Sequence, residues 1–403
     1  MRRLSRIISG LVTAAFCFLP LTANAGEAVQ SSDGYSKDGL WYYKDYGDGT
    51  VSVVCQDSTV EEAVVPSEID GHKITMIELD CFKDNTSLKK VTLPDTITVL
   101  EDYAFYLCSG LEEINIPDSV EKFGFQTFYG CSSLKEISVP AGLTEIEGYT
   151  FDGCTSLNAV HVNAKNQNYK DEDGILFTKD GTDLIVYPAA KPGTSYSVPA
   201  SCTKLEGYAF MANPYLEEIR IDSVTEIGED AFYYCTALKS MTIPEGITML
   251  TGATFGNCTS LESVVLPESL EAIGSGCFYY CLQLKNITIP AAVKTINENA
   301  FFNCPSLTRV TIPETVTQIG EYAFGFYSGD DETKQHLPDF EIDADNGTAA
   351  FEYAVKYNVK CTGGVTQGIV FVYIMIGIVA AVMIAVIVLV IAQKRYQKQH
   401  ELS

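Results

Sequence analysis

Thirteen cysteines are the side chains of this sequence with the widest chemistry, because a thiol can act as a nucleophile, a metal ligand or half of a disulfide. The sequence repeats a unit of about 23 residues, and one position of this unit is usually cysteine. Asn85 and Asn213 stand at this position in two copies, and an amide cannot form a disulfide. A 23-residue spacing also lacks the close ligand pairs of zinc sites. We therefore predict that most thiols are buried core groups, although a spacing of about 4.8 Å between neighbouring coils leaves oxidation between them open. Seven cysteines share this position: Cys108, Cys131, Cys154, Cys235, Cys258, Cys281 and Cys304.

The histidines and carboxylates form no recognisable catalytic pattern. Only His161 of the four histidines falls in the repeated part of the unit, and no Ser-His-Asp order, phosphate loop or H-E-x-x-H motif stands in a supporting context. The sequence therefore predicts that the protein is not an enzyme and has no metal or cofactor site. A formal net charge of −25 without a basic patch also argues against nucleic acid as a partner.

A recurring phenylalanine sets the frame that must position these side chains. Seven of the nine intervals are 23 residues, one is 22, and one is 59, which is 23 plus an insertion of 36. A fixed period of about 20 to 50 residues is typical of a solenoid, in which each unit buries its apolar face against its neighbours. The ten positions are Phe82, Phe105, Phe128, Phe151, Phe210, Phe232, Phe255, Phe278, Phe301 and Phe324.

The rest of the unit keeps the same phase. An aliphatic or aromatic residue precedes the phenylalanine by five positions, a leucine follows it by six, and a V-x-I-P segment comes next, as in Ile114-Asn115-Ile116-Pro117. The alternation in V-x-I predicts a short strand with its middle residue outward, and proline ends that strand because it has no N–H to donate. Stacked units therefore predict a parallel ladder of strands.

The combination of L-x-x-V-x-I-P, Ala-Phe and a Cys or Asn resembles the BspA-like class of bacterial surface leucine-rich repeats, across roughly residues 60 to 330. The resemblance implies a curved leucine-rich-repeat solenoid on the outside of a cell, often with a role in adhesion. We expect a solenoid of short parallel strands with an N-terminal hairpin cap, a C-terminal strand-helix cap and one C-terminal transmembrane helix.

Both ends of the sequence predict where the repeats lie. Arg2, Arg3 and Arg6 precede an apolar run that ends in a small-residue cleavage pattern, as in a secretory signal peptide. Residues 368–392 form an uncharged run that is long enough for a membrane helix. The basic residues after this run predict a cytoplasmic tail. We thus expect a single-pass protein of the cell membrane with extracellular repeats and an exported net charge of −30. Small residues at Gly377, Ala381 and Ala385 also allow weak pairing of two such helices, or are simply common in membrane helices.

Three segments depart from the repeat. Residues 34–59 predict a hairpin that closes the first coil, and the segment after Phe324 predicts a strand and a short helix. The insertion predicts a second hairpin, residues 175–187, that projects from the stack as a tolerated insertion or a recognition loop. The predicted organisation is a signal peptide 1–25, N-terminal cap 26–59, repeats 60–162, hairpin insertion 163–199, repeats 200–327, C-terminal cap 328–367, transmembrane helix 368–392 and tail 393–403.

Two columns of outward strand residues form the candidate binding surface. Threonine suits an exposed ladder without any function, but the same columns also suit a shallow groove for an extracellular protein or glycan. Our functional hypothesis is a membrane-anchored surface protein that binds or adheres through this face and the hairpin; the alternative is a passive scaffold of the cell envelope without a specific ligand. The candidate ligand-binding residues are Thr92, Asn115, Ser138, His161, Arg220, Thr242, Thr288 and Thr311, with Lys90, Glu113, Glu136 and Glu218 beside them.

Overall fold

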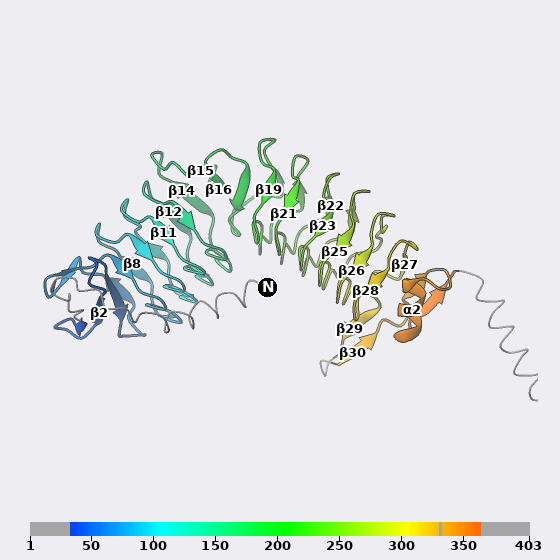
Figure 1. Ribbon diagram of the computed structural model, residues 1–403, viewed down its shortest axis with the longest axis horizontal. Helices are drawn as coiled ribbons and strands as arrows, with labels where there is room; N and C mark the ends of the chain where they lie inside the picture. The colour runs from blue at the N-terminus through cyan, green and yellow to red at the C-terminus, as the bar shows by residue number, and fades with distance from the viewer. Residues whose placement is uncertain (1–32, 330–332, 364–403) are drawn as a thin grey trace, which may run out of the picture.

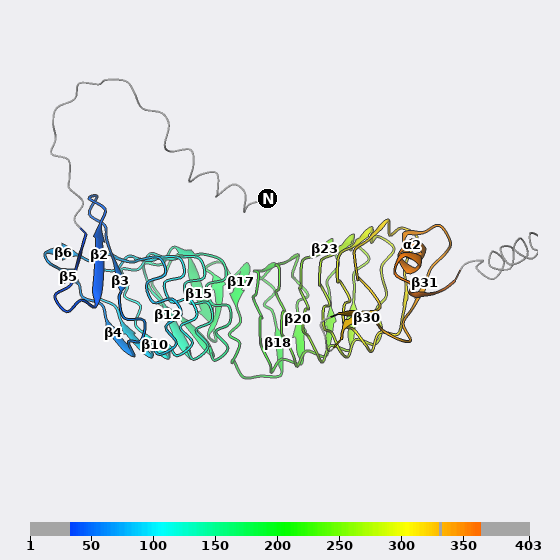
Figure 2. The same ribbon diagram turned by 90° about the horizontal axis from the view of Figure 1, so that it is seen from below.

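The computed structural model describes residues 33–329 and 333–363, which form an arch of stacked coils (Figure 1). Seen from below, strands such as β10, β18 and β20 lie along one edge of the stack, whereas β3, β17 and β23 lie along the other (Figure 2). No helix within this described part is long and apolar enough to cross a membrane. The predicted signal peptide, transmembrane helix, pairing residues Gly377, Ala381 and Ala385, and tail lie outside it.

The V-x-I segments form the predicted strands, and we call their parallel pairing the first ladder. Ile137 pairs with Val160 in register, and both side chains are buried. The next residues of the two strands, Ser138 and His161, pair with each other and face outward. The ladder runs in four stretches. The first contains β4, β8 and β10, the second β12 and β14, the third β18, β20, β22 and β24, and the fourth β27 with the C-terminal cap. Its repeat strands are β4 (Glu62–Val64), β8 (Lys90–Thr92), β10 (Glu113–Ile114), β12 (Glu136–Val139), β14 (Ala159–Val162), β18 (Ser195–Ser197), β20 (Glu218–Arg220), β22 (Ser240–Thr242), β24 (Ser263–Val265) and β27 (Arg309–Thr311).

A second ladder, which the sequence analysis did not predict, runs through the aliphatic position five residues before each repeat phenylalanine. Each strand has two residues in most coils, with the aliphatic side chain inward, as in the pairing of Leu100 with Phe123. Such short strands give too little alternation to be recognised from sequence. They are β7 (Met76–Ile77), β9 (Val99–Leu100), β11 (Lys122–Phe123), β13 (Glu145–Ile146), β17 (Asp183–Val186), β19 (Lys204–Leu205), β21 (Glu226–Ile227), β23 (Met249–Leu250), β25 (Ala272–Ile273), β26 (Thr295–Ile296) and β28 (Gln318–Ile319).

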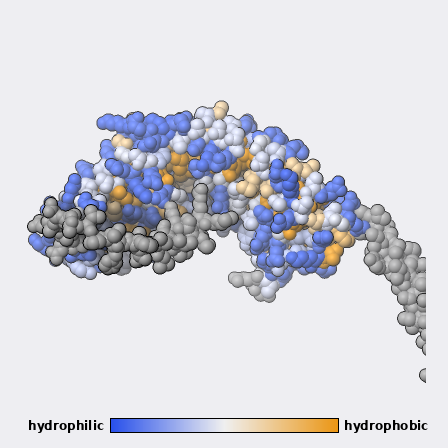
Figure 3. Space-filling view, viewed as in Figure 1, coloured by the Kyte–Doolittle hydropathy of each residue, from blue (hydrophilic) through white to orange (hydrophobic). Residues whose placement is uncertain are grey.

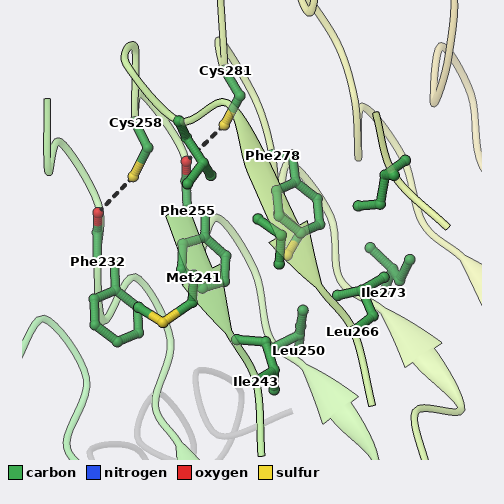
Figure 4. Packing of buried hydrophobic residues seen from close by; sticks show 14 of the residues in the cluster. Phe232, Met241, Ile243, Leu250, Phe255, Cys258, Leu266, Ile273, Phe278 and Cys281 are labelled. Carbon is green, nitrogen blue, oxygen red and sulfur yellow. Dashed lines mark hydrogen bonds between the residues drawn. The ribbon is translucent and has the colours of Figure 1, made fainter. Parts of the chain in front are cut away.

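The repeat phenylalanines stack on one another inside the coils, with neighbouring ring centroids 4.7 to 6.1 Å apart. Each column cysteine donates its S–H to the carbonyl oxygen of the phenylalanine of the preceding coil, as Cys258 does to Phe232 and Cys281 to Phe255 at 3.2 Å (Figure 4). All seven column thiols are buried and free. The prediction of core thiols is therefore confirmed.

The two ends of the stack are closed by non-repeat elements. At the N-terminal end, β1 (Gly34–Tyr35), β2 (Trp41–Asp45) and β3 (Val51–Cys55) form an antiparallel sheet, and β3 then pairs in parallel with β7. A short hairpin of β5 (Glu68–Ile69) and β6 (His72–Lys73) lies beside it. This arrangement converts an antiparallel edge into the first strand of the second ladder.

The C-terminal cap continues the first ladder through β31 (Glu341–Asp343) and β32 (Lys360–Thr362), after a hairpin of β29 (Phe326–Ser328) and β30 (Lys334–His336). Helix α2 (Ala349–Lys356) begins with Thr348, whose hydroxyl accepts a hydrogen bond from the Phe351 N–H. The helix places the Tyr353 hydroxyl against the backbone of Phe324, where it accepts from the N–H at 3.0 Å and donates to the C=O at 2.9 Å. One side chain thereby replaces the backbone of a further coil.

The insertion is part of the stack, so the prediction of a projecting hairpin is wrong. Strands β15 (Tyr169–Glu172), β16 (Ile175–Thr178) and β17 form an antiparallel meander, and Leu184 of β17 pairs in parallel with Leu205 of the next coil. Leu176 packs with the core of the N-terminal half, whereas Ile175 and Phe177 pack with that of the C-terminal half. Apolar residues on both faces of β16 demand burial on both sides, which a projecting hairpin cannot provide.

Candidate binding surfaces

The candidate residues of the first ladder all lie on its outward face. Every one is exposed except Lys90, which is half-buried. Figure 3 shows that hydrophilic residues cover most of the visible face of the arch, with hydrophobic residues in separate patches. The residues lie where the strand alternation predicted.

The charged candidates pair with each other. Lys90 contacts Glu113 at 2.9 Å across neighbouring strands, Arg220 contacts Glu218 at 2.7 Å, and His161 Nε2 lies 3.4 Å from Glu136. Exposed pairs of this kind contribute little stability, about 0 to 1 kcal/mol. They leave a face of paired charges and short hydroxyls.

Asn115 has a structural role within this face. Its amide oxygen accepts from the Leu93 N–H at 2.8 Å, and its amide nitrogen donates to the Leu93 C=O at 2.9 Å. The side chain therefore extends the hydrogen bonds of the first ladder by one position. Its polar atoms are already engaged in this way.

The candidate residues form two groups rather than one continuous column. Between β14 and β18 the first ladder is interrupted, because the Val160 N–H donates to Gly174 and the Val162 N–H to the Asp171 carboxylate. Residues from Thr92 to His161 lie before this break, and residues from Arg220 to Thr311 after it. We call the segment from Phe151 to Phe210 the junction.

A cavity of about 430 Å³ opens at the junction. This volume falls within the range of roughly 300–1,000 Å³ that is typical of small-molecule sites. Its walls come from the turn around Phe151, from β16 and β17 with the following residues, and from the turn around Phe210. The residues that define its character are Glu147, Tyr149, Asp152, Tyr187, Glu206 and Tyr208.

Asp152 is the most unusual side chain of the cavity. Only 8% of its surface is exposed, and its Oδ2 has no hydrogen-bond partner within the described residues. Burial, with a smaller contribution from the charge of Asp230, raises the pKa of Asp152 to about 8. Burial followed by the hydrogen bond to Asp230 also raises the pKa of Tyr208. The cavity thus holds a carboxyl group without the partner that its charged form requires.

The cavity exists because one coil of the stack is incomplete. Tyr187 stacks on Phe210 at 5.1 Å and lies 23 residues before it, so it occupies the repeat phenylalanine position. Tyr196-Ser197-Val198-Pro199 is the matching V-x-I-P segment. The insertion therefore contains a further repeat, whose Tyr187 follows β17 without the usual turn residues. The sequence analysis missed this repeat because it searched for phenylalanine alone.

The column thiols are held in their protonated form. Burial raises the pKa of the column thiols, to about 12 for Cys108, Cys235 and Cys304, so the nucleophilic thiolate is disfavoured. Across residues 33–329 and 333–363, no group of three His, Cys, Asp or Glu side chains is arranged to hold a metal ion.

A family model for the BspA type leucine rich repeat region matches residues 58–172 and 195–328, as six copies. The chain belongs to this family. The gap in the match, residues 173–194, covers the part of the junction where the BspA-type repeat loses its turn. No curated protein sequence matches the chain.

One solved structure with a TM-score above 0.5 shows the same fold, and other leucine-rich repeat structures are also similar. The pneumococcal vaccine antigen PcpA is 20% identical, with a TM-score of 0.51 over 83% of this chain and 98% of that one. A leucine-rich repeat protein from Eubacterium ventriosum is 22% identical, with a TM-score of 0.46 over 76% of this chain and 100% of that one. A leucine rich cell surface protein from Faecalibacterium prausnitzii is 20% identical, with a TM-score of 0.38 over 75% and 96%. At these identities the likeness concerns the solenoid alone.

Proposed function

We propose that this BspA-type protein is exported, held at the cell membrane by one C-terminal helix, and binds an extracellular protein or glycan through the outward face of the first ladder. Family membership supports the general class. The apolar residues 368–392 and the basic residues after them support the anchor. Membrane anchoring then presents the described residues outside the cell.

The observation that carries the proposal is the in-register presentation of outward side chains on this face. The backbone pairing of β8 with β10 sets Lys90 beside Glu113, and their side chains form an ion pair. A backbone surface that is already formed loses less conformational entropy when a ligand binds. Solenoids also present extended surfaces of this kind to their ligands.

The insertion contributes to binding only through its exposed turn. Lys179 and Asp180 are exposed between β16 and β17, whereas the apolar residues of both strands are mostly buried. A recognition role for the hairpin is therefore confined to this turn and its flanking residues. Nothing in the proposal requires catalysis.

The test uses the predicted exported part, residues 26–367, on arrays of extracellular matrix proteins and glycans. We expect saturable binding to at least one array member and a loss of about tenfold or more when Arg220→Glu and His161→Ala are combined. Lys294→Glu is the control for the charge reversal, because Lys294 is also an exposed basic residue paired with a glutamate, Glu271, but lies beside the second ladder. Binding that survives the double substitution contradicts the choice of face, and the failure of every array member to bind favours the scaffold alternative.

A further inference from the structure

Backbone hydrogen bonds link the turns around successive repeat phenylalanines, and we call this series the turn ladder. In the Phe105 coil, the N–H groups of Tyr103, Phe105 and Leu107 donate to carbonyl oxygens of the next coil at 2.9, 2.9 and 2.7 Å. The Phe128 coil donates in the same way to Gly148, Thr150 and Asp152. The first and third donors of each turn, such as Tyr103 and Leu107, have φ near +60° and lie four residues apart, whereas the middle donor, such as Phe105, has an ordinary φ.

The turn ladder stops at the cavity. Within the described residues, the N–H groups of Tyr149, Phe151 and Gly153 have no hydrogen-bond partner, although the equivalent groups one coil earlier all do. Tyr149 and Gly153 keep the left-handed φ of the series, at 64° and 72°. All three residues line the cavity, so one of its walls presents three donors.

The opposite wall presents acceptors. In a complete coil, three carbonyl oxygens around the phenylalanine accept from the preceding turn. Around Phe210, the Ala209 C=O accepts from the Tyr187 N–H at 2.7 Å, whereas the carbonyls of Gly207 and Met211 have no donor among the described residues. Both residues line the cavity. Donors on one wall therefore face acceptors on the other.

The side chains of the cavity favour a cation. Asp152 carries a buried oxygen without a partner and Glu229 lines the wall with it, whereas no lysine, arginine or histidine lines the cavity. Glu147 and Glu206 also line the walls, and they pair with Lys122 and Lys204, which lie outside the lining. The Tyr149 and Tyr208 rings lie with their centroids 4.7 Å apart at an angle of 58°. Aromatic faces attract ammonium and guanidinium groups. An anionic ligand would satisfy the donor wall but would be repelled by these carboxylates.

We propose that this cavity binds a short peptide segment of a partner protein that carries a basic side chain. The carbonyl oxygens of the segment accept from Tyr149, Phe151 and Gly153, its N–H groups donate to Gly207 and Met211, and its basic side chain pairs with Asp152. The segment thereby replaces the turn that the Tyr187 coil lacks. The site is separate from the outward face of the first ladder and stands without it.

A peptide fits better than a small amine because both walls offer backbone partners. A peptide that adopts the backbone conformation of the missing turn presents C=O groups to one wall and N–H groups to the other, as the turn around Phe128 does between its two neighbouring coils. A protonated amine can donate to Asp152 and to the carbonyl oxygens, but it has no acceptor for the N–H groups of Tyr149, Phe151 and Gly153. Peptide and amine therefore differ in a measurable way.

The test uses the full chain, purified in detergent, and a library of acetylated and amidated hexapeptides that each contain one lysine. Binding is measured by fluorescence polarisation against a matched library with norleucine in place of lysine. We expect saturable binding of a subset of the lysine peptides, and a loss of about tenfold to a hundredfold with norleucine, as for a hydrogen bond to a charged group. Methylation of the backbone nitrogens should reduce binding further, and n-butylamine should bind at least a hundredfold more weakly.

Two variants tie the binding to the cavity. Asp152→Asn should abolish the preference for lysine over norleucine, whereas Asp95→Asn, at an exposed carboxylate of the first repeats, should not. Gly148→Phe should block the cavity without strain, because a Cβ at Gly148 meets nothing within 4 Å. Its circular dichroism and melting temperature should match those of the parent chain.

Three results would overturn the proposal. The first is that no lysine peptide binds more tightly than its norleucine partner. The second is that binding survives Gly148→Phe, which would place it elsewhere on the molecule. The third is that n-butylamine competes as well as the best peptide, which would make the cavity an amine site without backbone recognition. None of them depends on the outcome for the first-ladder face.

Discussion

The coil around Phe128 and the junction are built from the same repeat, yet they differ in one turn. Around Phe128, the turn ladder is complete, β11 pairs with both of its neighbours in the second ladder, and the ring stacks on Phe105 and on Phe151. Around Tyr187, β17 and β18 pair with the next coil in both strand ladders, whereas the turn segment is missing. The stack thus tolerates the loss of one turn. The backbone groups that would form hydrogen bonds with this turn line a cavity instead.

The largest expected difference between these regions is the response to removal of the ring. Phe255 is fully buried between Phe232 and Phe278, at 5.1 and 5.5 Å. Phe255→Ala should reduce the free energy of unfolding by about 3–5 kcal/mol, since it removes buried area and leaves a cavity. Tyr187→Ala should cost about 1–2 kcal/mol less, because Tyr187 already borders a cavity and stacks on Phe210 from one side. Urea denaturation of both variants measures the difference.

Equal losses in these two variants would contradict the comparison, because they would show that the junction is packed as tightly as the repeats. Tyr215→Ala serves as the control, since this ring is 48% exposed and lies outside the phenylalanine stack. We expect it to change the free energy of unfolding by less than about 1 kcal/mol.

The second difference concerns the tyrosine hydroxyls that terminate ladders. At the C-terminal cap, the Tyr353 hydroxyl bonds to both the N–H and the C=O of Phe324. At the junction, the Tyr169 hydroxyl accepts from the Ile146 N–H at 3.1 Å and lies 3.4 Å from the Thr144 C=O. Tyr353→Phe should cost about 1–3 kcal/mol because it leaves buried backbone groups without partners. Tyr169→Phe should cost less, because its second bond is long.

Hydrogen exchange gives a second measurement of this pair. The amide of Phe324 should lose protection in Tyr353→Phe, and the amide of Ile146 should lose protection in Tyr169→Phe. If Tyr353→Phe leaves the Phe324 amide as protected as before, the cap is held by the packing of α2 and the hydroxyl is dispensable.

Much of the fold could be predicted because each repeat contains the same pattern of buried and exposed residues. The V-x-I-P segment combines period-2 alternation with a terminating proline, so the first ladder followed directly. The Asn at positions 85 and 213 indicated that the cysteine column holds a buried donor, and Asn213 indeed donates to Ala189 while Cys235 donates to Phe210. A local pattern that recurs in phase is sufficient for such predictions.

The junction could not be predicted from the same pattern. Residues 175–187 consist of two apolar runs around a Lys179-Asp180-Gly181 turn and so indicate a hairpin, but only tertiary packing decides where that hairpin lies relative to the stack. The cavity is lined by backbone groups without hydrogen-bond partners. Residue types alone do not indicate that the neighbouring coil lacks its turn. The useful signal was Tyr187, which keeps the period of 23 while changing the residue. Asp152, in a position where Tyr129 and Tyr233 stand in other coils, was a second signal.

The smallest expected difference is the pH dependence that Asp152 adds to the junction. Its pKa is raised to about 8 in the folded protein, from an ordinary value of 3.8, so the folded state holds this proton more tightly than the unfolded state. The free energy of unfolding should therefore fall as pH rises through the window from about 4 to about 8, by up to about 1.4 kcal/mol between pH 6 and 7. Asp152→Asn keeps the shape without the charge and should remove this part of the slope. Asp230, Tyr208 and Cys154 face the same carboxyl group and remain in the variant, so the difference between the two urea titrations isolates Asp152. Parallel curves for the two proteins would show that water or a bound cation already compensates the charge, and would make the junction electrostatically equivalent to the complete coils.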